Sequence, residues 1–164
     1  MTEAYLERAA LAYLERFASS AENLRRLLRR KVETRCRLRG EDPKPFLDLI
    51  GPVVARTVST GLVDDRRYAE GQIASFRRRG ASARGIKAKL AAKGVGRETV
   101  DTALAEENGG DRAAAQAHAR RRKLGPYRPG ERAAFRQKDL AVLARAGFLF
   151  DVAREVIDGE VDEG

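Results

Sequence analysis

The stretch ARGIKAKLAAKGV, Ala83 to Val95, decides the fold because it contains one complete short helix with its end signal. Ile86 and Leu90 are four residues apart, so at about 3.6 residues per turn they share one side of a helix. The cationic side chains fall on the other sides. Gly94 supplies the left-handed backbone conformation that ends many helices. The stretch therefore predicts an amphipathic helix with a narrow apolar face and a cationic flank.

The same helical pattern recurs on both sides of this stretch. SSAENLRRLLRRKV (19–32) aligns with ASARGIKAKLAAKGV (81–95), and LAVLARAGF (140–148) aligns with IKAKLAAKGV (86–95). No segment alternates apolar and polar residues as a strand would. We therefore expect an all-α fold made of three tandem three-helix repeats, each too small to bury a good core unless its neighbours stack on it.

Segments rich in glycine, proline and acidic residues separate the helical runs. They set the expected repeats at 1–60, 61–108 and 109–164, and the last repeat carries a short acidic tail. In the first repeat, Pro52 should kink the third helix or mark its true start. Ser19 with Glu22 predicts a capping box for the second helix, and Ser82 predicts a cap for the quoted helix. Asp64 or Asp65 should cap the helix that opens the middle repeat.

The composition favours a polyanionic partner. Lys and Arg outnumber Asp and Glu by 33 to 24, which gives a formal charge of +9. Cys36 is the single cysteine and fits a reducing cytosol, where it should serve as a helix filler. The region after Met1 does not resemble a signal peptide, and no run reaches the roughly 20 apolar residues of a membrane span. We expect a cytoplasmic protein that does not bind membranes.

Catalytic chemistry is poorly represented in the sequence. His118 is the only histidine, so a histidine-rich metal site is excluded. GVG at 94–96 is only a fragment of a phosphate-binding loop and lacks the strand and the Lys-Ser/Thr ending that such loops have. We therefore expect neither an enzyme nor a resident metal or cofactor.

The cations are organised more clearly. Segments 25–39, 77–97 and 120–138 each contain eight Lys or Arg, which together make 24 of the 33, and they occupy similar places in the three repeats. Arginine-rich solvated helix faces are common, but recurrence with the repeat favours a binding stripe along a phosphate backbone. The candidate binding residues are Arg25, Arg26, Arg29, Arg30, Arg77, Arg78, Arg79, Arg84, Lys87, Arg120, Arg121, Arg122 and Lys123.

A family resemblance adds to this prediction. GLVDDRRYAEGQIASFRRRGASARGIKAKLAAKGV (61–95), LGPYR (124–128) and LARAGFLFDVAREVI (143–157) resemble the RecX family of regulators of the RecA recombinase. The resemblance implies an elongated array of three tandem three-helix repeats. It also implies a non-catalytic regulator, usually an inhibitor, that binds the groove of the RecA–DNA filament in DNA repair and recombination. The expected partners are RecA and single- and double-stranded DNA, with the protein acting as a monomer.

A second function stays open at this point. RGAS (79–82) could be the turn of a helix-turn-helix transcription regulator, with Ser82 to Lys93 as its recognition helix. Such a protein would bind duplex DNA with sequence selectivity, usually as a symmetric dimer. Its recognition helix would offer Arg84 and Lys87 but no Asn or Gln to contact adenine. A helical RNA-binding protein is a further alternative.

Overall fold

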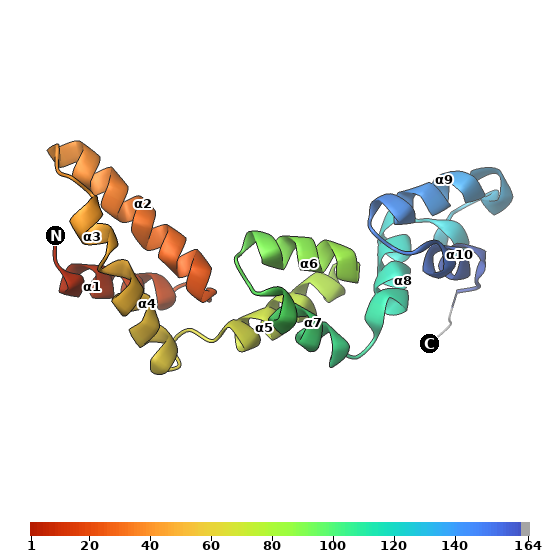
Figure 1. The fold of residues 1–164 in the computed structure, drawn as a ribbon. Coiled ribbons are helices and arrows are strands. Elements are labelled where there is room, and N and C mark those ends of the chain that lie inside the picture. The colour runs from red at the N-terminus through yellow and green to blue at the C-terminus, as the bar shows by residue number, and fades with distance from the viewer. Residues whose placement is uncertain (162–164) are drawn as a thin grey trace. The chain divides into compact units, whose positions relative to one another are not determined.

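The computed structural model describes residues 1–161 as helices joined by short loops (Figure 1). Within these residues there are ten α-helices, one short 3-10 helix and no strand, so the all-α prediction is confirmed. The elements are α1 (Glu3–Leu14), α2 (Ala21–Arg39), α3 (Lys44–Leu47), α4 (Ile50–Ser59), α5 (Asp65–Arg78), α6 (Ala83–Ala92), α7 (Arg97–Ala105), α8 (Gly110–Arg122), η1 (Gly125–Tyr127), α9 (Arg132–Arg145) and α10 (Phe150–Asp158). The last part of the predicted acidic tail, 162–164, lies outside the described residues.

Internal contacts divide the chain into two units. Unit 1 combines Met1–Ala69 with Ala91–Thr99, and unit 2 combines Glu70–Leu90 with the chain from Val100 onward. The border passes through α5, α6 and α7, so each of these helices contributes residues to both units. The division into three repeats at 60 and 108 describes sequence repetition and stays a prediction.

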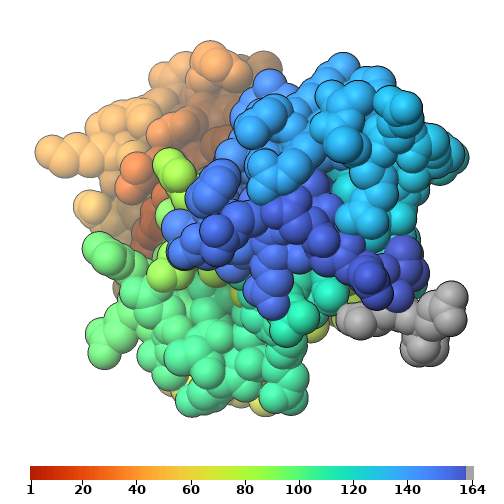
Figure 2. All heavy atoms as spheres, turned by 90° about the vertical axis from the view of Figure 1, so that its right-hand side faces the viewer, coloured from red at the N-terminus to blue at the C-terminus, as the bar shows by residue number. Residues whose placement is uncertain are grey.

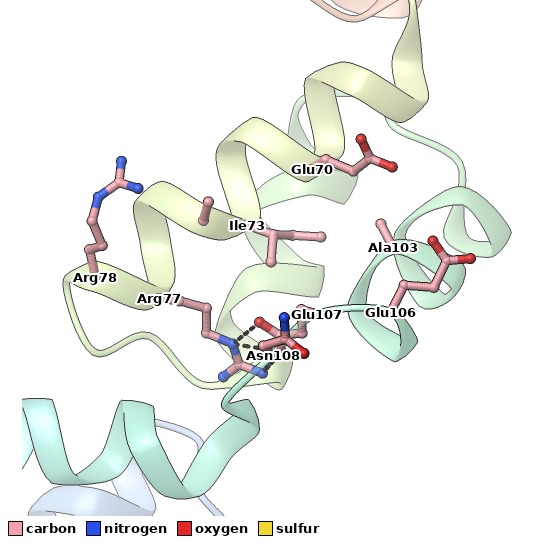
Figure 3. Close-up of a pocket in the computed structure, with 9 residues that line it drawn as sticks. Glu70, Ile73, Arg77, Arg78, Ala103, Glu106, Glu107 and Asn108 are labelled. Atoms are coloured by element: carbon pink, nitrogen blue, oxygen red, sulfur yellow. Dashed lines mark hydrogen bonds and ion pairs between the residues drawn. The ribbon is translucent and has the colours of Figure 1, made fainter.

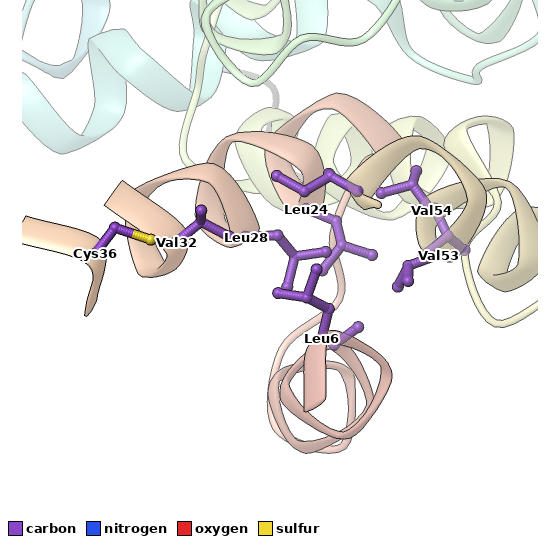
Figure 4. Close-up of a cluster of buried hydrophobic side chains, with 10 residues drawn as sticks. Leu6, Leu24, Leu28, Val32, Cys36, Val53 and Val54 are labelled. Carbon is purple, nitrogen blue, oxygen red and sulfur yellow. The ribbon is translucent and has the colours of Figure 1, made fainter. Parts of the chain in front are cut away.

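The core of unit 1 is formed by α1, α2 and α4. Helix α2 buries four side chains at four-residue spacing, from Leu24 to Cys36. Leu6 of α1 and Val53 and Val54 of α4 lie in the same cluster (Figure 4). Cys36 is only 1% exposed, as expected for a helix filler. Burial of branched aliphatic side chains of this size stabilises a fold by about 1.5–3 kcal/mol each.

Pro52 marks the start of a helix and does not kink one. The chain first forms the short helix α3, and α4 then begins at Ile50. Pro52 is the third residue of α4, where a backbone N–H would have no partner within the helix. Its fixed φ also suits the first turn, so the helix tolerates it there.

In unit 2, α8, α9 and α10 form a second core. Ala115 and Ala119 of α8 are fully buried against the cluster that contains Leu143 of α9 and Ile157 of α10. The small alanine side chains let the larger aliphatic ones approach the α8 backbone closely. Figure 2 shows α9 and α10 in blue as one closely packed surface.

The helix caps agree with the sequence in two places and differ in one. Asp64 caps α5, because its Oδ1 accepts a hydrogen bond from the Arg67 amide at 3.0 Å. Ser82 caps α6 through the Gly85 amide at 3.1 Å. The capping-box prediction for Ser19 is wrong by one residue. Ser20 caps α2, since its Oγ accepts from the Asn23 amide at 3.1 Å.

The N-terminus of α2 is joined to two later segments of unit 1. The Ser20 hydroxyl donates to the Lys93 carbonyl, and the Ala21 amide donates to Asp65 Oδ1 at 2.8 Å. Gly94, next to that carbonyl, has φ +76° and lies so close to Glu22 that an added Cβ would be 2.5 Å from Glu22 Cβ. We call this arrangement of a capping serine, an aspartate and a glycine-flanked carbonyl the serine–aspartate joint.

Unit 2 contains a second serine–aspartate joint at the N-terminus of α6. The Ser82 hydroxyl donates to the Ala146 carbonyl at 2.8 Å, and the Ala83 amide donates to Asp111 Oδ1 at 2.7 Å. Gly147 follows that carbonyl with φ +95°, and an added Cβ would lie 2.6 Å from Ser82 Oγ. The two units therefore build the same joint from the same residue types: a capping serine, an aspartate and a glycine.

A buried ion pair stabilises the turn before α9. Asp139 is 0% exposed and accepts hydrogen bonds from the Gly125 amide at 2.9 Å and from Arg128 Nε at 3.0 Å. Burial acts to raise the pKa of Asp139, but the hydrogen bonds from Arg128 and Gly125 and the Arg128 charge outweigh it and lower the pKa. The carboxylate is therefore charged at neutral pH.

We expect Gly94→Ala to destabilise the protein more than Gly40→Ala. Both glycines follow a helix and have similar positive φ, +76° and +66°, so both variants carry a strain of about 1–2 kcal/mol. Only Gly94 is crowded by Glu22, which adds about 1–3 kcal/mol, whereas nothing lies within 4 Å of a Cβ at Gly40. Urea unfolding followed by circular dichroism measures both losses, and equal losses would show that the joint is not tightly packed.

We expect Asp139→Asn to lower the free energy of unfolding at pH 7 by about 1–3 kcal/mol, because it leaves Arg128 without its charge partner. The lowered pKa means that the wild-type advantage is full above the ordinary value of 3.8 and is lost as the pH falls through the folded-state pKa. Asp158→Asn, which removes the exposed pair with Arg136, is the control and should cost less than about 1 kcal/mol. Thermal unfolding from pH 7 to pH 2 checks both statements.

Candidate nucleic-acid interface

The thirteen predicted binding cations differ in whether a carboxylate already neutralises them. Four of them form ion pairs, namely Arg25, Arg26, Arg77 and Lys87. The other nine have no carboxylate partner within residues 1–161, and they are Arg29, Arg30, Arg78, Arg79, Arg84, Arg120, Arg121, Arg122 and Lys123. The second group therefore contains the better candidates for contacts with a negatively charged ligand.

In the first cluster, α2 separates paired from unpaired arginines along its length. Arg25 and Arg26 both contact Glu22, and Arg26 also donates to the Ala92 carbonyl at 2.8 Å. The hydrogen bond from Arg25 is the largest cause of the lowered pKa of Glu22. Arg29 and Arg30, one turn later, are exposed and unpaired. The beginning of this cluster thus stabilises unit 1, while its continuation faces solvent.

Arg77 is removed from the surface by a network of partners. Its side chain is 13% exposed and donates from Nε to the two Glu107 oxygens at 2.8 and 2.9 Å, and from Nη1 to Asp111 at 2.6 Å. It also donates to the Ala81 carbonyl at 2.9 Å. Burial acts to lower the pKa of Arg77, but hydrogen bonds and charge from Glu107 and Asp111 raise it. Arg77 is permanently charged and internally neutralised, so we exclude it from the candidate surface.

The neighbouring residue has a different environment. Arg77, Arg78 and Glu107 are among the residues that line an open pocket of about 500 Å³. In Figure 3, Arg77 points toward Glu107, whereas Arg78 points away from it. Arg79 is exposed as well, and its guanidinium lies 5.6 Å from the Phe76 ring and donates to the Ser75 hydroxyl. Adjacent helix positions differ by about 100°, which explains why Arg77 and Arg78 serve different surfaces.

On α6, one of the two predicted cations is paired. Lys87 Nζ lies 2.8 Å from Asp101 Oδ1 of α7, although both side chains are about half exposed. Arg84 is exposed and has no carboxylate partner within the described chain. Lys89, which was not among the predicted residues, lies over the Phe76 ring at 4.7 Å. Of the two predicted cations on α6, Arg84 is therefore the one whose charge no carboxylate neutralises.

The third cluster divides into a free end and a structural part. The free end lies at the C-terminus of α8 and consists of Arg120, Arg121, Arg122 and Lys123. The helix dipole stabilises positive charges at this end of a helix. Arg120 stacks on Tyr127 at 5.4 Å, and the positive charges of Arg121 and Arg122 add to burial, the larger cause, in lowering the pKa of His118. The structural part of the cluster consists of Arg128, Arg132 and Arg136, which bond Asp139, the end of α10 and Asp158.

Residues 1–161 contain neither a cluster of metal-ligating side chains nor a membrane-spanning helix. Within residues 1–161, no group of three or more His, Cys, Asp or Glu side chains could hold a metal ion. The same residues contain no helix that is long and apolar enough to cross a membrane.

Comparison with known proteins identifies relatives over most of the chain. A family model described as RecX, second three-helix domain, matches residues 64–104, which span α5 to α7. The regulatory protein RecX of Myxococcus xanthus (strain DK1622) is 41% identical over 158 residues, which cover 94% of this chain and 84% of the relative.

Two further relatives carry the same name. The regulatory protein RecX of Agrobacterium fabrum (strain C58 / ATCC 33970) is 41% identical over 104 residues, 62% of this chain and 54% of the relative. That of Mycobacterium ulcerans (strain Agy99) is 34% identical over 140 residues, 83% of this chain and 81% of the relative. Since such identity extends over nearly the whole sequence, the chain belongs to the RecX family of regulatory proteins.

Proposed function

We propose that this RecX-family protein is a non-catalytic inhibitor of the RecA recombinase that binds the groove of the RecA–DNA filament as a monomer. The protein contacts phosphates of single- or double-stranded DNA in addition to RecA itself. The proposal puts the protein in the cytoplasm, together with the chromosomal DNA and the recombinase.

The observation that supports the proposal is the set of nine predicted cations without a carboxylate partner in residues 1–161. A single exposed ion pair contributes only about 0–1 kcal/mol, so no one of these residues can supply useful affinity. A ligand with closely spaced negative charges meets several cations at once and releases its counterions. A nucleoprotein filament is a ligand of this type.

We assign the central contact to Arg78, Arg79 and Arg84. All three are exposed and lack a carboxylate partner in the described residues, and the guanidinium group can pair bidentately with a phosphate or a carboxylate. Arg77 supports them indirectly. By bonding Glu107, Asp111 and the Ala81 carbonyl, Arg77 fixes the end of α5 and the loop that carries Arg79.

Inhibition by this route requires no chemistry in the regulator. A protein that contacts successive protomers or the enclosed DNA changes the free energy of subunit addition and release. It slows filament growth and nucleotide turnover when it binds the slower state more tightly, and the size of the effect is limited by its difference in affinity for the two states.

The helix-turn-helix alternative is less compatible with the surroundings of α6. Ser82 would be the first residue of the recognition helix, yet it is 1% exposed and its hydroxyl is bonded to the Ala146 carbonyl. The Ala83 amide is bonded to Asp111, and Lys87 is paired with Asp101. Ser82 and the first amide of α6, which lie where that class of protein begins its contacts with base edges, are therefore already bonded within the protein.

We expect the triple variant Arg78→Ala, Arg79→Ala, Arg84→Ala to inhibit RecA poorly. Loss of three exposed contacts to the filament should raise the half-inhibitory concentration by roughly tenfold or more. The measurement is DNA-dependent ATP hydrolysis by RecA, together with strand exchange, at several concentrations of the regulator.

The control is the variant Arg8→Ala, Arg16→Ala, Arg67→Ala. It removes the same total charge from exposed residues outside the three cationic clusters, so inhibition should change less than about twofold. Equal loss of inhibition in both triple variants would show that only the net charge matters, and unchanged inhibition in the first variant would remove the assigned contact.

We expect binding to a single-stranded oligonucleotide to weaken steeply with salt. Each phosphate contact contributes a slope of about 0.7 in a plot of log affinity against log salt concentration. Removing Arg78, Arg79 and Arg84 should therefore lower the slope by about 2. Fluorescence anisotropy from 50 to 300 mM salt gives the slope. A slope near zero for the wild-type protein would assign the surface to a protein contact alone.

A further inference from the structure

An open groove between α1 and α2 of unit 1 has properties that the proposed function does not use. The groove has a volume of about 470 Å³ and contains Tyr5 of α1 and, from α2, Leu27, Arg30, Lys31, Arg35 and Leu38. The α2 residues have helical spacing and share one side of that helix. Of this set, only Arg30 was predicted from the sequence to bind a ligand.

The ionisable groups that line the groove, apart from the Tyr5 phenol, are all cations. Arg30, Lys31 and Arg35 have no carboxylate partner within residues 1–161, and the groove lining contains no acid. Glu33, the acid nearest to them in sequence, is exposed on another side of α2. The groove therefore carries an uncompensated positive charge that suits an anionic ligand.

Arg35 is the most constrained of these cations. Its guanidinium lies over the Tyr5 ring at 4.7 Å from the centroid, and its Nε atom is buried without a hydrogen-bond acceptor in the described residues. A buried donor without a partner costs about 1–3 kcal/mol, more when it is charged. A ligand oxygen that bonded the terminal nitrogens of the same guanidinium would form a charge-assisted hydrogen bond and offset part of this cost.

The groove also exposes apolar surface. Leu38 is 81% exposed, which is the largest value among the exposed large hydrophobic side chains of residues 1–161. Together with the half-buried Leu27, it places an apolar contact beside the three cations. A ligand that covered it would have to present both negative charge and an apolar group.

We propose that this groove, which we call the Tyr5–Arg35 groove, binds an acidic segment of a protein partner in which carboxylates flank an apolar side chain. One carboxylate bonds Arg35, the next lies between Arg30 and Lys31, and the apolar side chain covers Leu38. The proposal shares Arg30 with the cations of the RecA proposal, but it concerns a different ligand and is tested by a different readout.

Nucleic acid fits the groove less well. A phosphate backbone would pair with the cations but would leave Leu38 exposed. Base stacking would need a free aromatic face, yet Arg35 covers one face of Tyr5 and the ring packs against the core of unit 1. The charge alone would suit both ligands, and the apolar contact favours the acidic peptide.

The test uses the full chain and a fluorescein-labelled twelve-residue peptide of Glu-Glu-Leu repeats. The peptide should bind, and a matching Gln-Gln-Leu peptide should bind more weakly by about tenfold or more, because charge-assisted hydrogen bonds are lost. Arg35→Met keeps an unbranched side chain over Tyr5 and removes the charge, so it should also weaken binding by about tenfold. Arg37→Met is the matched control, since Arg37 is an exposed cation of the same helix outside the groove, and it should change binding less than about twofold.

Leu38→Asn tests the apolar contact without risk to the fold, because the side chain is exposed. It should weaken binding of the Glu-Glu-Leu peptide severalfold while circular dichroism stays unchanged. The proposal is overturned if the peptide does not bind, if the Arg35 and Arg37 variants lose binding equally, or if Leu38→Asn has no effect. It is also overturned if a twelve-nucleotide dT oligonucleotide binds more tightly than the peptide and is equally sensitive to Arg35→Met, since the groove would then be a nucleic-acid site.

Discussion

The serine–aspartate joint is the contact on which both units depend. In each unit a helix N-terminus is brought against later segments, and its amide groups need partners. One serine hydroxyl serves twice, accepting from an amide of its own helix and donating to a carbonyl at the end of another. An aspartate from the first turn of a third helix bonds the next amide. A cap contributes about 1 kcal/mol and a charge-assisted hydrogen bond about 1.5–3 kcal/mol, so this small set of atoms fixes three helices together.

Two helix ends lack the close contacts of the serine–aspartate joint. Gly40 ends α2 as Gly94 and Gly147 end α6 and α9, but nothing lies within 4 Å of a Cβ placed on it. The N-cap residue of α9 is Glu131, which makes no side-chain cap. Arg132 instead donates to the Ile157 and Gly159 carbonyls of α10 and its end. Gly40 and the N-terminus of α9 are therefore not part of a serine–aspartate joint.

The helices could be predicted from the sequence because their signals are local. Leu24 and Leu28, like Ile86 and Leu90, are four residues apart, and burial follows directly from that spacing. The joint could not be predicted, because Ser20 meets Lys93 across 73 residues and two adjacent serines offered equivalent caps. The role of Arg77 was missed for a similar reason. Its partners Glu107 and Asp111 are 30 and 34 residues away, and a run of three arginines gives no sign that the first is paired within the protein.

The net charge of +9 is not spread evenly over the cations, because some of them are paired with carboxylates and others are not. Glu22, Asp65, Glu107, Asp111 and Asp139 are used in contacts that hold helices and turns in place, and they neutralise only the cations beside them. The cations that remain unpaired have no such neighbour, so their field is reduced only by solvent and salt. At physiological ionic strength that field extends about 8 Å, which is too short for a ligand with isolated charges to sense several arginines at once. Duplex DNA carries one charge per about 1.7 Å of its axis, so a ligand of that charge density would present several charges to the proposed contacts within one screening length.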